Sequence, residues 1–238
     1  MLSILQTMNP APCRMEFDIA PFRLSGVVYG ALLNHGPAMA AMDGAAHLPP
    51  YNAPAVAPVL YVKPRNTLAG HGDAIVVPED APELEVGASL GIVIGRTACR
   101  VREDEALGHV AGYTIVGDIS VPHGSFYRPS IRFKARDGFC PIGPGVVARG
   151  EIADPDALAV RVHVDGALVH ETTTGERRRP VARLLAEVSA FMTLSPGDVL
   201  LLGASAGAPR VRAGQRVRIE IDGLGRLDNH FIAEGAAP

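Results

Sequence analysis

Residues 87–95 read GASLGIVIG, a run that ends in a hydrophobic stretch closed by a glycine. Its length and its Ile and Val content are typical of a buried strand that enters a turn. Glu83 and Glu85 lie just upstream at a spacing of two, which places both carboxylates on one face of an extended chain. The stretch therefore predicts a core strand, and it raises the question of whether carboxylates on this strand hold a metal ion.

Short runs of the same kind continue from Val59 almost to the C-terminus. They are β-branched, are separated by Gly, Pro or Asp, and read VLYVKP, AIVVP, YTIVGDISV, LAVRVHVDG, DVLLLG and RVRIEID. Asp-Gly pairs at 165–166 and 222–223 predict hairpins. Because the strands do not alternate with long helices, a doubly wound sheet is disfavoured. We expect an α+β, β-rich fold built on a rolled mixed β-sheet with few short helices.

Two helices are expected within this β-rich pattern. Residues 180–194 place their apolar side chains on one stripe, with Pro180 in the first turn and Ser195-Pro196-Gly197 as the stop. A shorter helix is expected at residues 103–110.

The composition changes near residue 58. Residues 1–58 are rich in Ala, Pro and Met, and we expect an N-terminal segment that serves as a lid or dimer arm, or only as a surface connector. Residues 59–238 are expected to form the catalytic-fold domain.

Composition excludes several classes of partner. The 238 residues carry a net charge of −3 with acids and bases interspersed, so neither a nucleic acid nor an anionic membrane surface is an expected partner. No apolar run approaches the ~18 residues of a membrane span, and the N-terminus lacks a secretory pattern. Three scattered cysteines, Cys13, Cys99 and Cys140, predict no disulfide framework. We expect a cytoplasmic protein that binds a small anionic metabolite.

The stretch Gly203-Ala204-Ser205-Ala206-Gly207 fits the G-x-S-x-G pattern of serine hydrolases. That pattern needs a following helix, whereas the chain continues with turn and strand residues. The pattern therefore indicates a turn at which Gly203 lets the backbone approach a ligand or another strand, and a serine hydrolase acting through Ser205 is kept only as a third hypothesis.

Residues 126–144, FYRPSIRFKARDGFCPIGP, hold the densest group of candidate binding residues. If the segment is a strand, Arg132, Lys134 and Arg136 share one face and form a pocket for carboxylates, or they mark a solvated edge strand. Pro64 holds Lys63 in an extended conformation. The Lys63 side chain either faces a ligand as a cation or points to solvent.

Five motifs occur in a characteristic order: KPRNT, GYTIVGDIS, KARDGFCPIGP, FMTLSPGDVLLLG and IDGLGRLDN. From Tyr29 onward the chain resembles the fumarylacetoacetate hydrolase family. LLNHGPA and FYRPSIRFKARDGFCPIG resemble the branch of isomerases and decarboxylases that act in 4-hydroxyphenylacetate degradation. The resemblance implies an enolate intermediate, and a homodimer or a hetero-oligomer with a paralogous subunit. Its implied substrates are 5-oxopent-3-ene-1,2,5-tricarboxylate, which is decarboxylated, and 2-hydroxyhepta-2,4-diene-1,7-dioate, which is isomerised.

Metal-dependent members of this family hold Mg²⁺ or Mn²⁺ with two Glu of an E-x-E strand and one Asp. The resemblance assigns that Asp to Asp118 and the two Glu positions to Gly87 and Ser89, so both Glu ligands are missing. Glu85 lies about 7 Å along the strand from the first of these positions, on the same face. No metal ligand is therefore assigned, and Mg²⁺ or Mn²⁺ stays only a family trait.

Other parts of the family pattern are replaced as well. The His and Glu of the lid motif fall on Ala38 and Ala41, the Arg after the Asp motif falls on Pro122, and the Thr of T-G-T-P falls on Leu202.

Without a metal, the resemblance leaves Lys134 as general acid/base or enolate stabiliser, and Asp118 to orient it or shuttle a proton. The expected substrate-binding residues are Lys63, Arg128, Arg132, Asp137 and Gly203. Two alternatives stay open: a non-catalytic partner of a metal-binding paralogous subunit, or another C–C hydrolase of the family.

Overall fold

The long strand predicted from GASLGIVIG is β5 (Leu84–Ile94), and it runs through the middle of a curled sheet. The structure is a computed structural model that describes residues 26–49, 52–124 and 131–236. Within these residues the sheet has eight strands, and β11 (Arg210–Val211) pairs with β5 beside the main order. That order is β2 (Val59–Lys63), β1 (Val28–Leu32), β10 (Val199–Leu201), β5, β6 (Val110–Ser120), β7 (Cys140–Ala148) and β3 (Leu68–Ala69).

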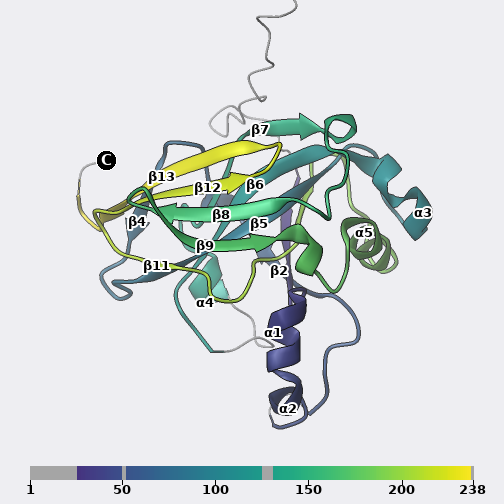
Figure 1. The fold of residues 1–238 in the computed structure, drawn as a ribbon, viewed down its shortest axis with the longest axis horizontal. Helices are drawn as coiled ribbons and strands as arrows, with labels where there is room; N and C mark the ends of the chain where they lie inside the picture. The colour runs from purple at the N-terminus through teal and green to yellow at the C-terminus, as the bar shows by residue number, and fades with distance from the viewer. Residues whose placement is uncertain (1–25, 50–51, 125–130, 237–238) are drawn as a thin grey trace, which may run out of the picture.

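A second sheet of five strands lies against the first (Figure 1). Its order is β4 (Ala74–Val77), β13 (Gly225–Ala233), β12 (Arg216–Ile221), β8 (Ala159–Val164) and β9 (Ala167–Thr173). β13 packs on β6 and β7, and β12 packs on β6, so apolar side chains of both sheets share one core. Parallel pairs (β1 with β10, β3 with β7, β4 with β13) occur among antiparallel ones, which confirms the predicted mixed sheet.

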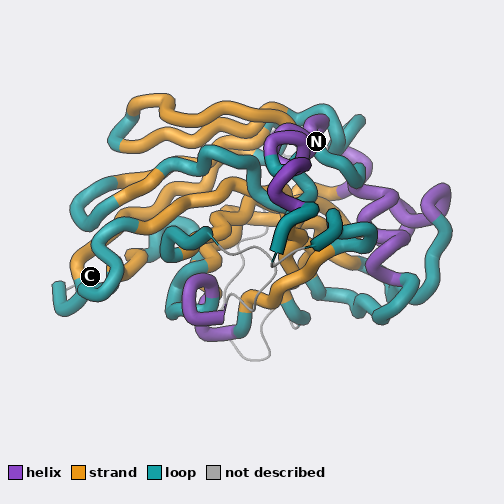
Figure 2. The backbone as a smooth tube through the Cα atoms, turned by 90° about the horizontal axis from the view of Figure 1, so that it is seen from below, coloured by secondary structure: helices purple, strands orange, loops and turns teal. Residues whose placement is uncertain are grey.

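Helices are few and short, and they lie at the margins of the strands (Figure 2). They are α1 (Gly36–Ala41), α2 (Asp43–Ala46), α3 (Glu103–Ala106), α4 (Ile131–Lys134) and α5 (Val181–Ser189). Single turns of 3₁₀ helix occur at η1 (Arg65–Thr67), η2 (Leu107–His109), η3 (Arg149–Glu151) and η4 (Thr174–Glu176). No helix in these described ranges has the length and apolarity needed to cross a bilayer.

The two predicted helices exist but are shorter than expected. In α5 the buried residues Val181, Leu184 and Val188 form the predicted stripe, but the helix ends at Ser189, and Leu194 pairs with Ala98 as a β-bridge. The helix predicted at 103–110 is α3 followed by η2, and Val110 already begins β6.

Both predicted hairpins are present. Asp165 and Gly166 connect β8 to β9 with φ values of 51° and 85°, the left-handed pair that a tight two-residue turn requires. Asp222 and Gly223 lie in the turn between β12 and β13.

The strand reading of residues 132–136 is wrong, because residues 131–134 form the helical turn α4. Arg136 donates to Asp80 at 2.6 and 2.9 Å, Arg132 is exposed and Lys134 is buried. The three cations therefore do not line one pocket face.

The segment predicted as a lid or arm also contributes to the sheet, because β1 pairs with β10 and β2. α1 and α2 follow β1 and project below the sheets in Figure 1. Asn34, at the start of this projection, donates to the carbonyls of Leu202 and Arg179. The base of the projection is thus fixed, and its role as a lid stays a prediction.

Candidate functional site

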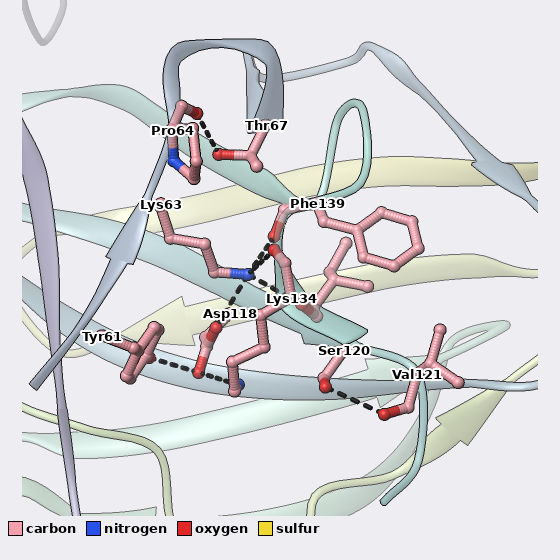
Figure 3. Close-up of polar contacts among 10 residues, drawn as sticks. Tyr61, Lys63, Pro64, Thr67, Asp118, Ser120, Val121, Lys134 and Phe139 are labelled. Atoms are coloured by element: carbon pink, nitrogen blue, oxygen red, sulfur yellow. Dashed lines mark hydrogen bonds and ion pairs between the residues drawn. The ribbon is translucent and has the colours of Figure 1, made fainter. Parts of the chain in front are cut away.

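A buried ion cluster centred on Asp118 joins strands that are far apart in the sheet order (Figure 3). Lys134 Nζ and Tyr61 Oη donate to Asp118 Oδ2 at 2.7 and 2.5 Å. Lys63 Nζ lies 3.0 Å from Asp118 Oδ1. Tyr61 and Lys63 are on β2, which is an edge strand of the sheet, and Asp118 is on β6. The curl of the sheet therefore brings β2 close to Asp118.

Lys63 is the most deeply enclosed cation of this cluster. Its side chain has no solvent exposure, and its ammonium donates to the carbonyls of Ile119, Lys134 and Phe139 at 2.7, 3.0 and 2.8 Å. Burial lowers the pKa of Lys63, and the nearby Asp118 carboxylate opposes that effect. All three of its protons are donated to carbonyls, so in this arrangement Lys63 holds three backbone segments and Asp118 together.

The charges of the cluster sum to +1, from two ammoniums and one carboxylate. Burial alone would raise the pKa of Asp118, but Lys134 and Lys63 outweigh burial and hold that pKa well below its usual range. Burial and the adjacent Asp118 raise the pKa of Tyr61 well above its usual value, which keeps the phenol protonated. The cluster is therefore a fixed centre of positive potential suited to an oxyanion.

Lys134 is the cation of the cluster that reaches the surface. Its side chain is 10% exposed, against 0% for Lys63 and 4% for Asp118. Its Nζ lies 4.8 Å from the centre of the Tyr61 ring and donates to one acceptor, Asp118, among the described residues. Lys134 thus combines a fixed position with protons that are free for a ligand.

The sequence contains a signal for this site that the motif reasoning missed. The chain has two lysines among its 22 basic residues, and both of them contact Asp118. Tyr61 was also missed, although its spacing of two from Lys63 on a strand puts both side chains on one face.

The remaining predicted site residues lie outside the cluster. Asp137 accepts a hydrogen bond from Asn66 Nδ2 at 2.7 Å, in an exposed turn. Gly203 has a φ of +101° and donates its N–H to Ser89 Oγ at 3.1 Å. Arg132 is exposed on α4, and Arg128 lies outside the described residues.

Ser205 is hydrogen-bonded to Thr172 at 3.0 Å and to Arg177 at 3.1 Å. The residues after it form a turn and then β11, so no helix presents its hydroxyl as a serine hydrolase would require.

The residues around Asp118 do not fit a divalent metal ion. Gly87 is paired with Asp118 across β5 and β6, and a Cβ at Gly87 would lie 2.6 Å from the Ala204 Cβ, so the place of a glutamate side chain is filled. Both Asp118 oxygens already face ammonium or phenol groups. Glu83, upstream, is paired with Arg212. Among the described residues, no three acidic, His or Cys side chains gather in a group able to hold a metal.

Replacing Gly87 with Ala is expected to lower the free energy of unfolding by about 1–3 kcal/mol, because the added methyl group overlaps the Ala204 methyl group in a packed interior. Urea denaturation measures the change. Gly150→Ala is the matched control, since a Cβ at Gly150 meets no atom within 4 Å. Equal stabilities of the two variants would show that there is room at position 87 for a larger side chain.

The curled mixed sheet and the site on β2, β6 and α4 define a family. The model of the fumarylacetoacetate (FAA) hydrolase C-terminal family matches residues 27–232, and the chain belongs to this family. Among curated proteins, the 4-hydroxyphenylacetate degradation bifunctional isomerase/decarboxylase of Salmonella dublin is 39% identical over 211 residues, covering 89% of this chain and 48% of that protein. The chain spans about half the length of this relative and of two isomerase/decarboxylase relatives from Escherichia coli.

Solved structures confirm the fold. The 2-hydroxyhepta-2,4-diene-1,7-dioate isomerase of Mycobacterium marinum superposes with a TM-score of 0.73 at 30% identity, covering 89% of this chain and 76% of that one. Maleylpyruvate hydrolase of Sphingobium sp. SYK-6, in complex with manganese(II) ion and pyruvate, gives 0.71 at 26% identity, with coverages of 87% and 70%. A metal is thus found in a relative, while the residues around Asp118 lack the ligands for one.

Proposed function

We propose that this chain is a subunit of a 4-hydroxyphenylacetate-pathway isomerase/decarboxylase in which Lys134 serves the enolate chemistry that a metal serves in relatives. The observation that carries the proposal is the cluster of net charge +1, with Lys134 as its least buried member and Asp118 as its fixed anchor. The relatives named for isomerisation and decarboxylation support the reaction class.

One intermediate connects the two reactions. Decarboxylation of 5-oxopent-3-ene-1,2,5-tricarboxylate releases CO₂ and leaves the bonding electrons in a dienolate, which becomes 2-hydroxyhepta-2,4-diene-1,7-dioate when its oxygen is protonated. Isomerisation of that product removes the same hydroxyl proton and returns a proton to a terminal carbon of the dienolate. In both reactions the dienolate oxygen lies beside Lys134. The Lys134 ammonium stabilises the dienolate charge and gives the oxygen its proton after decarboxylation, and the neutral amine form of Lys134 takes the enol proton in isomerisation.

Asp118 positions Lys134 in this scheme. Its carboxylate is held in the charged form by two ammoniums, and it accepts hydrogen bonds from Lys134 and Tyr61 on the same oxygen. Lys63 anchors Asp118 from the other side. The substrate carboxylates and the oxyanion then meet a positive centre whose geometry is set before binding.

A second candidate function is that of a non-catalytic partner for a metal-binding paralogous subunit. The absence of a metal-binding group among the described residues favours it. A homodimer is the assembly expected for the first function, and a hetero-oligomer with that paralogue for the second.

The purified chain alone is expected to convert 2-hydroxyhepta-2,4-diene-1,7-dioate at the same rate with chelator and with added Mg²⁺ or Mn²⁺. The reason is that the charge-stabilising group is a lysine and not a metal. Product masses separate the reactions: isomerisation conserves mass, decarboxylation of the tricarboxylate loses CO₂, and hydrolysis by a family C–C hydrolase adds water. Activity that appears only on adding the paralogous subunit supports the second function, and activity that chelator abolishes contradicts the proposed role of Lys134.

A further inference from the structure

The Arg177 guanidinium is a buried charge that the protein leaves largely unpaired. The residue follows η4, is 7% exposed, and donates through Nη2 to Ser205 Oγ at 3.1 Å. Its Nε and Nη1 are enclosed and have no hydrogen-bond partner among the described residues. Burial lowers the pKa of Arg177 to about 10, so the side chain stays charged at neutral pH.

The two arginines that follow show what a partnered arginine looks like in this segment. Arg178 donates to the carbonyl of Ala55 at 2.8 Å. Arg179 donates to the carbonyl of Val56 and to Glu187. These contacts tie the chain after η4 to the loop before β2 and to α5, whereas Arg177 takes part in neither.

No carboxylate of the described residues forms a hydrogen bond or ion pair with Arg177. The charge of Glu176 opposes the lowering of the Arg177 pKa, but Glu176 accepts from Thr172 Oγ1 at 2.8 Å and pairs with His35 Nε2 at 3.2 Å. His170 lies close enough that burial, and then His35 and Arg177, lower its pKa. A buried cation beside two histidines lowers the stability of the fold unless an anion binds to it, because the neighbouring carboxylate is already hydrogen-bonded to other groups.

One short segment connects this region to the Asp118 cluster. Ser205, the partner of Arg177, is next to Ala204, whose methyl group packs where a Gly87 Cβ would stand, on the strand paired with Asp118. Gly203 donates to Ser89 on that same strand. The Gly203–Ser205 turn therefore lies between the strand that carries Gly87 and the Arg177 guanidinium.

We propose that Arg177 forms a subsite for the carboxylate of a small organic acid. Its Nε and Nη1 N–H groups, which have no partner among the described residues, donate to the carboxylate, while the Ser205 hydroxyl accepts from Arg177 Nη2 and donates to Thr172. The identity of the ligand rests on the proposed function. The ligand group is the carboxylate of 2-hydroxyhepta-2,4-diene-1,7-dioate that lies farther from Lys134. Because its charge is not paired, Arg177 stabilises the fold less than a paired arginine does. The binding site is in return already charged before the ligand binds.

The test uses heptanedioate, the saturated C7 dicarboxylate, because it carries both carboxylates and no enol and cannot react. The wild-type chain is expected to bind it in a calorimetric titration and to melt at a higher temperature in its presence. Arg177→Met is expected to weaken that binding at least about tenfold, the loss of one charge-assisted hydrogen bond or more. Arg96→Met removes the same charge from an exposed position and is expected to bind like the wild type.

A stability measurement separates a binding arginine from a structural one. Without ligand, Arg177→Met is expected to melt at or above the wild-type temperature, because the variant removes an enclosed charge and one hydrogen bond to Ser205. A lower melting temperature together with unchanged heptanedioate affinity would overturn the subsite. Equal stabilisation by inorganic phosphate at matched ionic strength would also overturn its assignment to carboxylates. Because binding is measured without turnover, tight Arg177-dependent binding in an inactive chain would sink the proposed function and leave the subsite standing.

Discussion

Replacing Lys63 with methionine is expected to lower the free energy of unfolding by about 3–5 kcal/mol, the largest stability change that any single substitution in the site is expected to cause. The ammonium is fully enclosed, donates to three backbone carbonyls and lies 3.0 Å from Asp118. Methionine matches the length of the side chain but donates no hydrogen bond. The carbonyls of Ile119 and Lys134 lose this donor in a fully enclosed site, while Phe139 keeps the bond from the Ile119 amide.

Lys134→Met is the matched control for this measurement. It removes the same charge from the same cluster, but the three carbonyl bonds of Lys63 and the Lys63–Asp118 pair stay in place. Urea denaturation of both variants is expected to separate them by about 2 kcal/mol or more. Equal midpoints and slopes for the two variants would mean that the carbonyl network contributes little and that only the cluster charge matters.

Much of the fold could be predicted from the sequence, because the strands carry strong local signals. β5, β8 and β12 are β-branched and end at glycine or Asp-Gly turns, so their existence and the hairpin at Asp165 follow from local chemistry. The order of the strands is set by long-range pairing, and the family motifs predicted the rolled mixed sheet that the strand pairs confirm.

The segment at residues 131–136 could not be assigned from its pattern. A spacing of four residues places Arg132 and Arg136 on one face of a strand and also on one face of a helix, so the two periods cannot be told apart over so few residues. The tertiary contacts decide: Lys63 binds the carbonyl of Lys134, and Arg136 Nε donates back to the carbonyl of Arg132 at 3.2 Å. The helical turn places the Lys134 carbonyl next to the buried Lys63 ammonium. This contact cannot be predicted from the local sequence pattern.

The resemblance assigns Gly87 and Ser89 to the positions at which metal-dependent members of the family have glutamates. The structure adds that Ala204 fills the space next to Gly87 and that Gly203 donates to Ser89. A glutamate placed at position 87 would therefore meet Ala204.

Replacing Lys134 with methionine is expected to lower turnover of 2-hydroxyhepta-2,4-diene-1,7-dioate by about 10²–10⁴-fold, the usual contribution of a positioned proton-transfer group. Stability is expected to change by about 1 kcal/mol or less, because Lys63 and Tyr61 still satisfy Asp118 and the net charge of the cluster falls from +1 to zero. Rates are measured with the chain alone and with chelator present. Full activity in a folded Lys134→Met variant rules out the assigned role.

Because the chain contains two lysines and Lys63 is fully enclosed, an amine-acylating reagent is expected to modify Lys134 among the lysine side chains, and heptanedioate is expected to protect it. Lys134→Arg then separates the two tasks of the side chain. A guanidinium keeps the charge beside Asp118 but does not release a proton near neutral pH. Loss of turnover with retained heptanedioate binding assigns proton transfer to Lys134, whereas turnover within about tenfold of the wild type, too small a loss for a proton-transfer group, assigns it electrostatic stabilisation of the dienolate alone.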